Sequence, residues 1–572
     1  MKKNNSFSVA VFALLATAVF ALSACSDKVY EEINTDPTKV SQANPSAQLT
    51  FSELQIFGDM TYVDVHRLYT YAFTQHLMGC WNTTYYGGQH RMDDNEMSRP
   101  WNNLYPGAIR NLTDAIYQTK DDANQANVHA ALRILRVYVG GLLTDVYGDV
   151  PYTEAGLGYI TGNVTPVYDK QEAIYRSFFE ELKEAIKLFN SEAASITSDP
   201  LFEGNLTAWK LFANSLRLRY AMRISDILPD LAQTEFAAAL ADGVMSSAAD
   251  DACVKHMNVS YSFGQESYKD FRGNAMSKYF FGNDPANNPT FICQTMWDQL
   301  NKTNDPRMKR LCRFYIDDYI SLSTGDGRID MTDAVIATQQ ANPAAKVIWL
   351  IAPGMFSWDN WPDYSQAAVA GSPLETAVAE VQAAHPGYSP GDNPRWLMPK
   401  LAINFLRSDN PGVLMTYAEV CFLRAEAAIN GWTGDNAKQM YEEGIRASMD
   451  FLANHYGCDA ITDGEFAAYL AEPTVAWGAV KDQQKSQINT QAWILHFHNP
   501  AEAWANIRRA DFPKLTPPDP NGKNSLIDGK EIPVRLCYPQ AENKDNQAEC
   551  DAAKARVEGG YSWNARLWWD VK

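Results

Sequence analysis

The chain has 572 residues, of which 46% are hydrophobic and 20% charged, and this balance excludes collagen-like, low-complexity and wholly disordered proteins. Its 49 lysines and arginines stand against 68 aspartates and glutamates, a formal net charge of −19. An excess of negative charge argues against nucleic-acid binding, because phosphate contacts need clustered positive charge.

The first 24 residues have the pattern of a secretory signal peptide. Lys2 and Lys3 precede an apolar run at residues 9–22, which is shorter than the about 20 apolar residues of a membrane-spanning helix. The run ends in Leu-Ser-Ala-Cys at residues 22–25, which resembles the lipobox of bacterial lipoproteins. That resemblance implies that Cys25 becomes the lipidated first residue of the mature chain. Residues 25–46, which are poor in apolar side chains, are predicted to be a flexible tether.

Helical periodicity begins at about residue 47. The clearest prediction is a helix over residues 171–189, whose apolar side chains fall on one stripe. Asp169 and Glu172 have the spacing of a capping box at its start. A second helix is predicted over residues 206–227, with its basic side chains on a solvated or salt-bridged face.

Predicted helices also come in pairs. Residues 413–430 and 436–454 are separated by the break Gly-Trp-Thr-Gly-Asp, and residues 127–147 pair with 170–189 across a longer connector. The first pair spans roughly the length of a tetratricopeptide unit, a helix–turn–helix of about 34 residues. Stacked pairs bury a continuous face that one pair alone cannot bury.

Three segments of different character interrupt the helices. They are rich in Gly, Pro, Asn, Asp and aromatic residues, and they cover residues 247–290, 320–400 and 510–572. Long loops inside a compact chain usually carry function or form a subdomain. Within the second, residues 347–351 form a short strand-like run.

The predicted fold is therefore mainly α, with tetratricopeptide-like paired helices in an α-solenoid half, packed against an irregular, loop-rich lobe with little β structure. Residues 47–572 are expected to form one domain. Its helical half is expected mainly at residues 47–245 and 401–455, and its irregular ligand lobe mainly at residues 247–400 and 510–572.

Most of the mature chain carries recognisable motifs. They lie at residues 144–152 (TDVYGDVPY), 167–172 (VYDKQE), 209–219 (WKLFANSLRLR), 304–307 (NDPR), 414–420 (LMTYAEV), Trp504 with Arg508-Arg509, and 532–536 (IPVRL) with Tyr538-Pro539. In this order they resemble the SusD/RagB family of nutrient-binding outer-membrane lipoproteins. The Asn-Thr-Asp-Pro tether at residues 34–37 agrees with them. These motifs are structural and do not report the ligand.

The resemblance implies a tetratricopeptide-like half that supports an irregular ligand-binding half. It also implies a lipid-anchored protein on the outer face of the outer membrane, which caps a SusC-like TonB-dependent transporter barrel. Such a protein passes oligosaccharides or, in some members, peptides to the barrel. Both ligand classes stay open at this point.

Two loop segments, residues 80–88 and 356–364, combine aromatic rings with Asn or Asp. A Trp or Tyr ring covers the C–H face of a sugar, and amides or carboxylates bind its hydroxyls. The predicted ligand-binding residues are Trp81, Asn82, Tyr86, Trp358, Asp359 and Trp361. The alternative is that these rings attach the loops to the helices, because large aromatics are usually buried. Four other tryptophans in helical or turn contexts are predicted to be packing residues: Trp209, Trp432, Trp504 and Trp568.

No pattern for catalysis stands out. The sequence lacks a GxSxG elbow, an HExxH motif, a P-loop and a dinucleotide fingerprint. We therefore expect that the protein is not an enzyme and binds no cofactor. A surface glycosidase is the less favoured alternative, because carboxylate pairs are uninformative in so acidic a chain. A surface adhesin would need β-rich repeats, which the helical pairing disfavours.

Metal and disulfide patterns are also weak. No further His or Cys is grouped with His496 and His498 in the sequence, so these two do not predict a zinc site. The acidic segment at residues 325–333 lacks the ligand spacing of an EF-hand loop, so no calcium site is predicted. The cysteines after Cys25 form no CxxC pair and are expected to be mostly buried thiols. A disulfide between Cys537 and Cys550 is left open.

Overall fold

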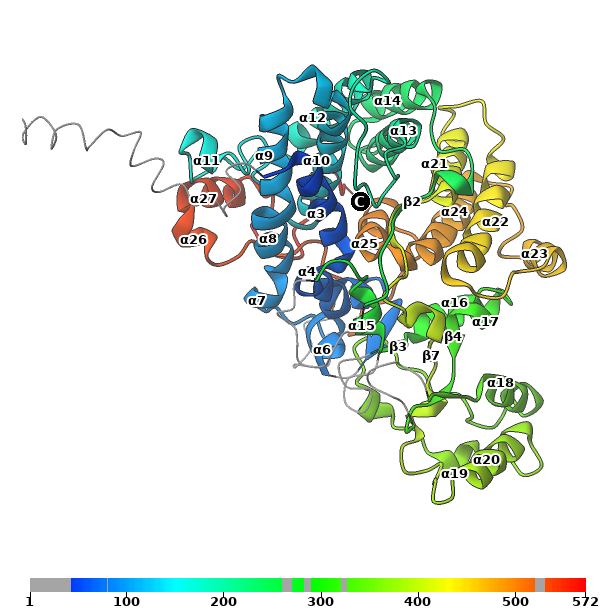
Figure 1. The fold of residues 1–572 in the computed structure, drawn as a ribbon. Coiled ribbons are helices and arrows are strands. Elements are labelled where there is room, and N and C mark those ends of the chain that lie inside the picture. Colours follow the sequence, from blue (N-terminus) through cyan, green and yellow to red (C-terminus); the bar gives the residue numbers. More distant parts are fainter. Residues whose placement is uncertain are drawn as a thin grey trace, which may run out of the picture. The chain divides into compact units, whose positions relative to one another are not determined.

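Most of the chain is helical (Figure 1). This computed structural model describes residues 43–79, 81–259, 270–281, 290–319, 327–519 and 530–571. The chain divides into two units, residues 1–44 and 45–572, and the description below concerns the second unit. The predicted signal peptide and Cys25 lie outside the described residues.

The N-terminal helices pack against one another in chain order. The longer ones are α3 (Pro45–Gly58), α9 (Arg110–Thr119), α10 (Ala126–Tyr147), α12 (Gln171–Leu188), α13 (Leu206–Arg223) and α14 (Pro229–Asp242). Helix α10 packs on α9 and α12, and α13 packs on α12 and α14. Figure 1 shows this group in blue to green. The helices predicted at residues 127–147, 171–189 and 206–227 are confirmed.

A second helical group follows near the C-terminal end of the chain. It contains α21 (Tyr417–Ile429), α22 (Ala437–Tyr456), α23 (Asp463–Leu470), α24 (Lys481–Leu495) and α25 (Pro500–Ala510). Helix α21 packs against α22 and α24, and it also contacts α13 of the first group. The mainly α fold with tetratricopeptide-like paired helices is thus confirmed.

The predicted helix at residues 413–430 starts later than expected. Residues Gly412–Met415 form strand β8, which pairs antiparallel with β2 (Ala252–Val254). The Thr416 side chain then accepts a hydrogen bond from the Glu419 N–H, so the helix begins at Tyr417. Apolar composition alone does not separate a buried strand from a helix here.

The capping prediction for α12 is wrong. Asp169 accepts hydrogen bonds from the Tyr152 and Thr153 N–H groups instead. The Gln171 N–H at the helix start donates to Asp149 Oδ1 at 2.8 Å. A carboxylate from the turn after α10 therefore accepts a hydrogen bond from the first residue of α12.

The arginines of α13 are buried and salt-bridged rather than solvated. Arg219 binds Glu419 on α21 through two hydrogen bonds of 2.6 and 2.7 Å. Arg223 donates from Nη2 to both carboxylate oxygens of Glu502 on α25. Because all four side chains are buried, these pairs connect the two helical groups.

The segments between the helical groups carry short strands in two-stranded antiparallel sheets. The pairs are β1 (Leu77–Gly79) with β3 (Thr290–Ile292), β4 (Cys312–Arg313) with β7 (Lys400–Leu401), and β5 (Tyr315–Ile316) with β6 (Ile329–Asp330). This region also holds α16 (Gln294–Lys302), α18 (Thr332–Ala341) and α20 (Pro373–Ala384). Residues 327–400 are therefore more helical than their sequence indicates.

The strand-like run at residues 347–351 forms no strand. Ile351 makes one isolated parallel bridge with Cys293, while the Val347 and Ile348 N–H groups donate to the Gln339 side chain. A side chain from α18 takes the place of a neighbouring strand.

The remaining described α-helices are short. They are α4 (Met60–Val65), α5 (Tyr71–Phe73), α6 (Trp81–Thr83), α7 (Asp94–Met97), α8 (Arg99–Leu104), α11 (Gly158–Thr161), α15 (Met276–Phe281), α17 (Met308–Leu311), α19 (Tyr364–Ala367), α26 (Glu542–Asp545) and α27 (Gln547–Ala555). No helix among the described residues is long and apolar enough to span a bilayer.

Trp209 and Trp504 are buried, and Trp432 and Trp568 pack partly buried against the core, which confirms them as packing residues. Most of the described cysteines are buried, as expected, and all of those that the structure assigns are free thiols. Cys537 and Cys550 are among them, so they form no disulfide with each other.

Candidate functional site

The two aromatic loop segments meet in the folded chain. The Thr84 hydroxyl donates to the Met355 carbonyl oxygen at 3.3 Å, and the Gln89 side chain donates to the Gly354 carbonyl oxygen at 3.4 Å. Four of the predicted ligand residues have described side chains: Asn82, Tyr86, Asp359 and Trp361. The side chains of Trp81 and Trp358 lie outside the described part of the structure. We call residues 81–91 and 351–361 the two-loop surface.

The first loop is a short helix, α6, followed by a π-helical turn at Thr84–Gly88. A Cβ on Gly87 would lie 2.5 Å from the Leu68 carbonyl oxygen, so only glycine permits this close approach. Asn82 and Tyr86 are half-buried, and the Tyr86 ring packs against Tyr69, with centroids 6.1 Å apart. Tyr86 therefore attaches the loop to the helices and keeps part of its ring accessible.

The second loop contains a 3₁₀ turn at Ser357–Asn360. Asp359 is exposed, and one of its carboxylate oxygens accepts a hydrogen bond from the Phe356 N–H at 3.3 Å. Trp361 is 43% exposed, with the Arg395 guanidinium 5.4 Å from its ring centroid. A cation held near an aromatic ring restrains that ring. Trp361 is thus an oriented aromatic surface in contact with solvent.

A third segment lies beside these loops; the sequence placed it in the irregular lobe but did not indicate that it contacts the second loop. The Gln75 side chain donates to the Thr516 carbonyl oxygen at 2.6 Å, and a Cβ on Gly354 would lie 2.6 Å from the Pro518 Cβ. Residues 512–519 follow α25 and contain three prolines, which disfavour helix there. That composition marks a loop, but it carries no signal for which distant segment the loop meets.

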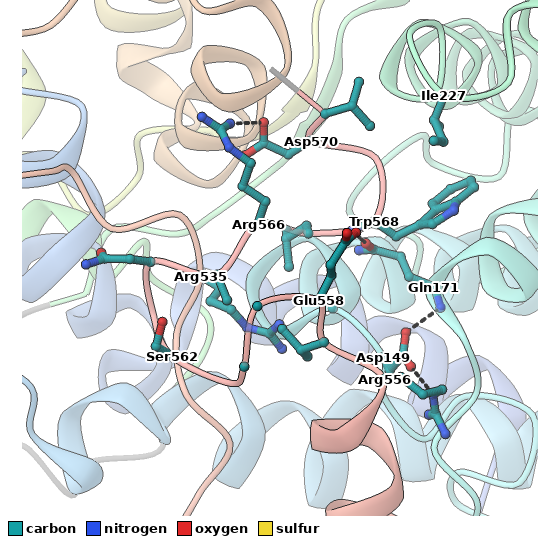
Figure 2. A pocket seen from close by; sticks show the side chains of 18 of the residues that line it. Asp149, Gln171, Ile227, Arg535, Arg556, Glu558, Ser562, Arg566, Trp568 and Asp570 are labelled. Atoms are coloured by element: carbon teal, nitrogen blue, oxygen red, sulfur yellow. Dashed lines mark hydrogen bonds and ion pairs between the residues drawn. The ribbon is translucent and has the colours of Figure 1, made fainter.

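A separate cavity of about 730 Å³ lies where the C-terminal residues cross the end of α10 (Figure 2). Its wall includes Gly148, Asp149, Gln171, Arg535, Tyr538, Arg556, Glu558, Ser562, Asn564, Arg566, Trp568 and Asp570. The Arg556 guanidinium pairs with Asp149 at 2.6 Å, and Arg566 pairs with Asp570 at 2.6 Å. None of the predicted ligand residues lines this cavity.

Of the two histidines noted in the sequence, His496 is buried and His498 is half-buried. The His498 ring stacks on Tyr456, and burial lowers the pKa of His498 to about 3. His496 Nε2 lies 3.4 Å from a Glu419 carboxylate oxygen. Within the described ranges, no three His, Cys, Asp or Glu side chains gather as a metal site would require.

Comparisons with known proteins point to one family. The SusD-like family model, described as "Starch-binding associating with outer membrane", matches residues 37–340 and 373–539. A solved structure described as "Bacteroidetes AC2a SusD-like" is 73% identical, with a TM-score of 0.88 over 93% of this chain and 100% of that one. No curated protein matches the sequence.

Two further solved structures are similar at lower sequence identity. One, described as a chitin-binding protein, is 30% identical, with a TM-score of 0.73 over 92% of this chain and 100% of that one. A SusD homolog from Bacteroides fragilis is 21% identical, with a TM-score of 0.64 over 92% and 100% of the two chains. The second likeness bears on the fold alone.

Proposed function

Because this chain belongs to the SusD-like family of outer-membrane-associated carbohydrate-binding proteins, we propose that it captures oligosaccharides at the cell surface and passes them to a SusC-like TonB-dependent transporter barrel. Family members are binding proteins rather than enzymes, and we propose binding without catalysis here.

The meeting of the two aromatic loops at Thr84 and Met355 carries this proposal. Sugar rings bind on aromatic faces with polar groups at their edges. We propose that Trp81, Asn82 and Tyr86 contact the ligand from the first loop, and that Trp358, Asp359 and Trp361 contact it from the second. The exposed Trp361 ring supports stacking on a saccharide.

For the ligand, we propose chito-oligosaccharides as the class to test first. The chitin-binding protein that is 30% identical over most of both chains supports this choice. The family description names starch, so malto-oligosaccharides are the second class.

For the anchor, we propose a cleaved signal peptide at residues 1–24, a lipid on Cys25, a tether to residue 46 and a binding domain at residues 47–572. Several acyl chains give stable anchoring, whereas one chain binds a membrane only marginally. The tether would hold the domain at the outer membrane beside the barrel.

Two measurements test the function. Calorimetric titration with chito-, malto- and other oligosaccharides, and with a peptide mixture, should give saturable binding to one saccharide class. Saturation by peptides alone would overturn the carbohydrate assignment. Affinity purification in mild detergent should return a large outer-membrane barrel, since a stable complex of this kind buries on the order of 2,000 Å² or more. Recovery of this protein alone would contradict the transporter partnership.

A further inference from the structure

Arg535 places a buried positive charge on the wall of the cavity in Figure 2. The residue is 2% exposed, and its Nη2 donates to the Tyr147 carbonyl oxygen at the end of α10. Its Nε is buried without a hydrogen-bond partner. Among the residues that the structure describes, no carboxylate lies within ion-pair distance of this guanidinium. Buried charges are normally paired, so this arrangement calls for a counter-charge.

The other two arginines on the cavity wall already have counter-charges. Arg556 is paired with Asp149, and Arg566 with Asp570 (Figure 2). The C-terminus of α10 offers Arg535 the equivalent of about half a negative charge, which is less than a full counterion. A net positive charge is therefore left at Arg535.

The fold holds this guanidinium in place. Gly148 has φ +89°, and a Cβ there would lie 3.1 Å from Arg535 Nη2, so a side chain would crowd the arginine. The Tyr561 ring lies 4.8 Å from the guanidinium carbon and the Tyr538 ring 5.6 Å from it. A cation fixed between a helix end and two rings is oriented before any ligand arrives, which lowers the cost of binding.

We propose that this cavity binds a small molecule that carries one carboxylate, of the size of a sugar acid. The planar guanidinium matches a carboxylate through two parallel hydrogen bonds. One unpaired positive charge balances one negative charge, and the exposed Glu558 carboxylate on the wall disfavours a dianion such as phosphate. The volume lies within the roughly 300–1,000 Å³ of small-molecule sites.

The rest of the wall suits a polar ring bearing that carboxylate. Ser562 and Asn564 are exposed on the wall and can donate to and accept from hydroxyl groups. Trp568 offers a half-buried ring on the same wall. This site shares no residue with the two-loop surface. It is therefore a second site, and the positive charge of Arg535 makes it selective for an anionic ligand.

Calorimetric titration of the full chain in low salt tests the proposal, with D-glucuronate and D-galacturonate as probes. D-glucose is the neutral control, and inorganic phosphate is the dianion control. We expect saturable binding of a uronate, and an affinity for glucose and for phosphate that is at least tenfold lower. Uronate affinity should fall at high salt, because salt screens the attraction between the charges. No binding of either uronate, or equal binding of phosphate or glucose, overturns the proposal.

Two variants locate the binding. Arg535→Gln removes the charge and should weaken uronate binding at least tenfold. Because Arg535 is buried, a second variant leaves the core intact: Ser562→Asp adds a negative charge on the exposed wall and should weaken binding severalfold. Ser191→Asp adds the same charge on an exposed turn outside the cavity and should leave affinity unchanged.

Uronate binding at wild-type affinity in Ser562→Asp and in any folded Arg535→Gln protein overturns the proposal. Chito-oligosaccharide binding at the two-loop surface should be the same in all three variants, so the two sites are tested separately.

Discussion

The Thr84 hydroxyl donates to the carbonyl oxygen of Met355, a residue 271 positions away, at 3.3 Å. The Gly79 carbonyl oxygen shares the same hydroxyl proton at 2.6 Å, so one side chain fixes its own loop and contacts the other. The two aromatic loops are therefore connected by the Thr84 and Gln89 side chains and by backbone carbonyl oxygens, which substitutions of the aromatic rings leave in place. This separation allows ligand contacts to be tested without rearranging the loops.

Trp361→Ala should weaken oligosaccharide binding by about 1–2 kcal/mol, roughly five- to thirtyfold, because it removes an aromatic anchor. The melting temperature should change little, since the ring is 43% exposed. Calorimetric titration and thermal unfolding measure the two effects. Trp504→Ala is the control, because that buried ring should cost about 3–5 kcal/mol of stability. Unchanged affinity in Trp361→Ala, and in Trp81→Ala and Trp358→Ala, would place the ligand elsewhere.

Gly354→Ala should disturb the contact between the second loop and residues 512–519. Gly354 has φ +76°, and the new Cβ would lie 2.6 Å from the Pro518 Cβ. Gly371→Ala is a matched control, with φ +71° and nothing within 4 Å of its Cβ. Both variants carry backbone strain of about 1–2 kcal/mol, and only Gly354→Ala adds a clash. We expect weaker oligosaccharide binding in Gly354→Ala alone; equal affinities would show that the loop contact does not shape the site.

Glu53 should make the protein less stable as the pH rises. Its side chain is fully buried, and burial, together with the Asp199 carboxylate, raises the pKa of Glu53 well above its usual value. Above about pH 4.5 the unfolded chain releases this proton while the folded protein keeps it, so the free energy of unfolding falls with pH up to the raised pKa.

Glu53→Gln should remove this dependence, because the amide stays neutral and can donate to Asp199. The stability difference between the variant and the wild type should therefore shift in favour of the variant from pH 5 to pH 8. Urea unfolding at several pH values measures it, with the exposed Glu192→Gln as control. A difference that stays constant with pH would rule out a proton on Glu53.

Arg219→Ala should destabilise the protein by roughly 3–5 kcal/mol, because it leaves Glu419 buried without its cation. Burial acts to raise the pKa of Glu419, but the Arg219 guanidinium outweighs it and lowers that pKa to about 2. The double variant Arg219→Met/Glu419→Leu should recover much of the loss. Arg176→Ala, which breaks an exposed pair with Glu172, should cost about 0.5 kcal/mol or less. Denaturant unfolding measures the stability of all three variants. A loss of stability in Arg219→Ala as small as that in Arg176→Ala would contradict the role of the buried pair.

Cys25→Ser should release the protein from the membrane fraction, since the serine cannot carry the thioether-linked lipid. Its thermal unfolding should match the wild type, because the domain begins beyond the tether. Fractionation before and after a high-salt wash measures the effect. A variant that stays with the outer membrane after the wash is held there by something other than lipid.

The sequence alone determined the helical half of this fold. Helix α12 covers Gln171–Leu188 where periodicity predicted residues 171–189, and the break after residue 430 separates α21 from α22 as expected. Helical periodicity reports contacts three and four residues apart, which the local sequence contains. The motifs quoted from residues 144 to 539 likewise led to the family that the comparisons support.

Only the tertiary structure decided which side chains come together. Asp149 rather than Asp169 binds the start of α12, and Arg219 pairs with Glu419. Arg535 lies on a cavity wall with its Nε buried and no carboxylate of the described residues in ion-pair distance. Each of these contacts depends on how long segments pack, because the partners are far apart in the sequence. Local composition indicates which residues are charged or aromatic, but the hydrogen bonds and burial that fix their roles arise only when distant segments meet.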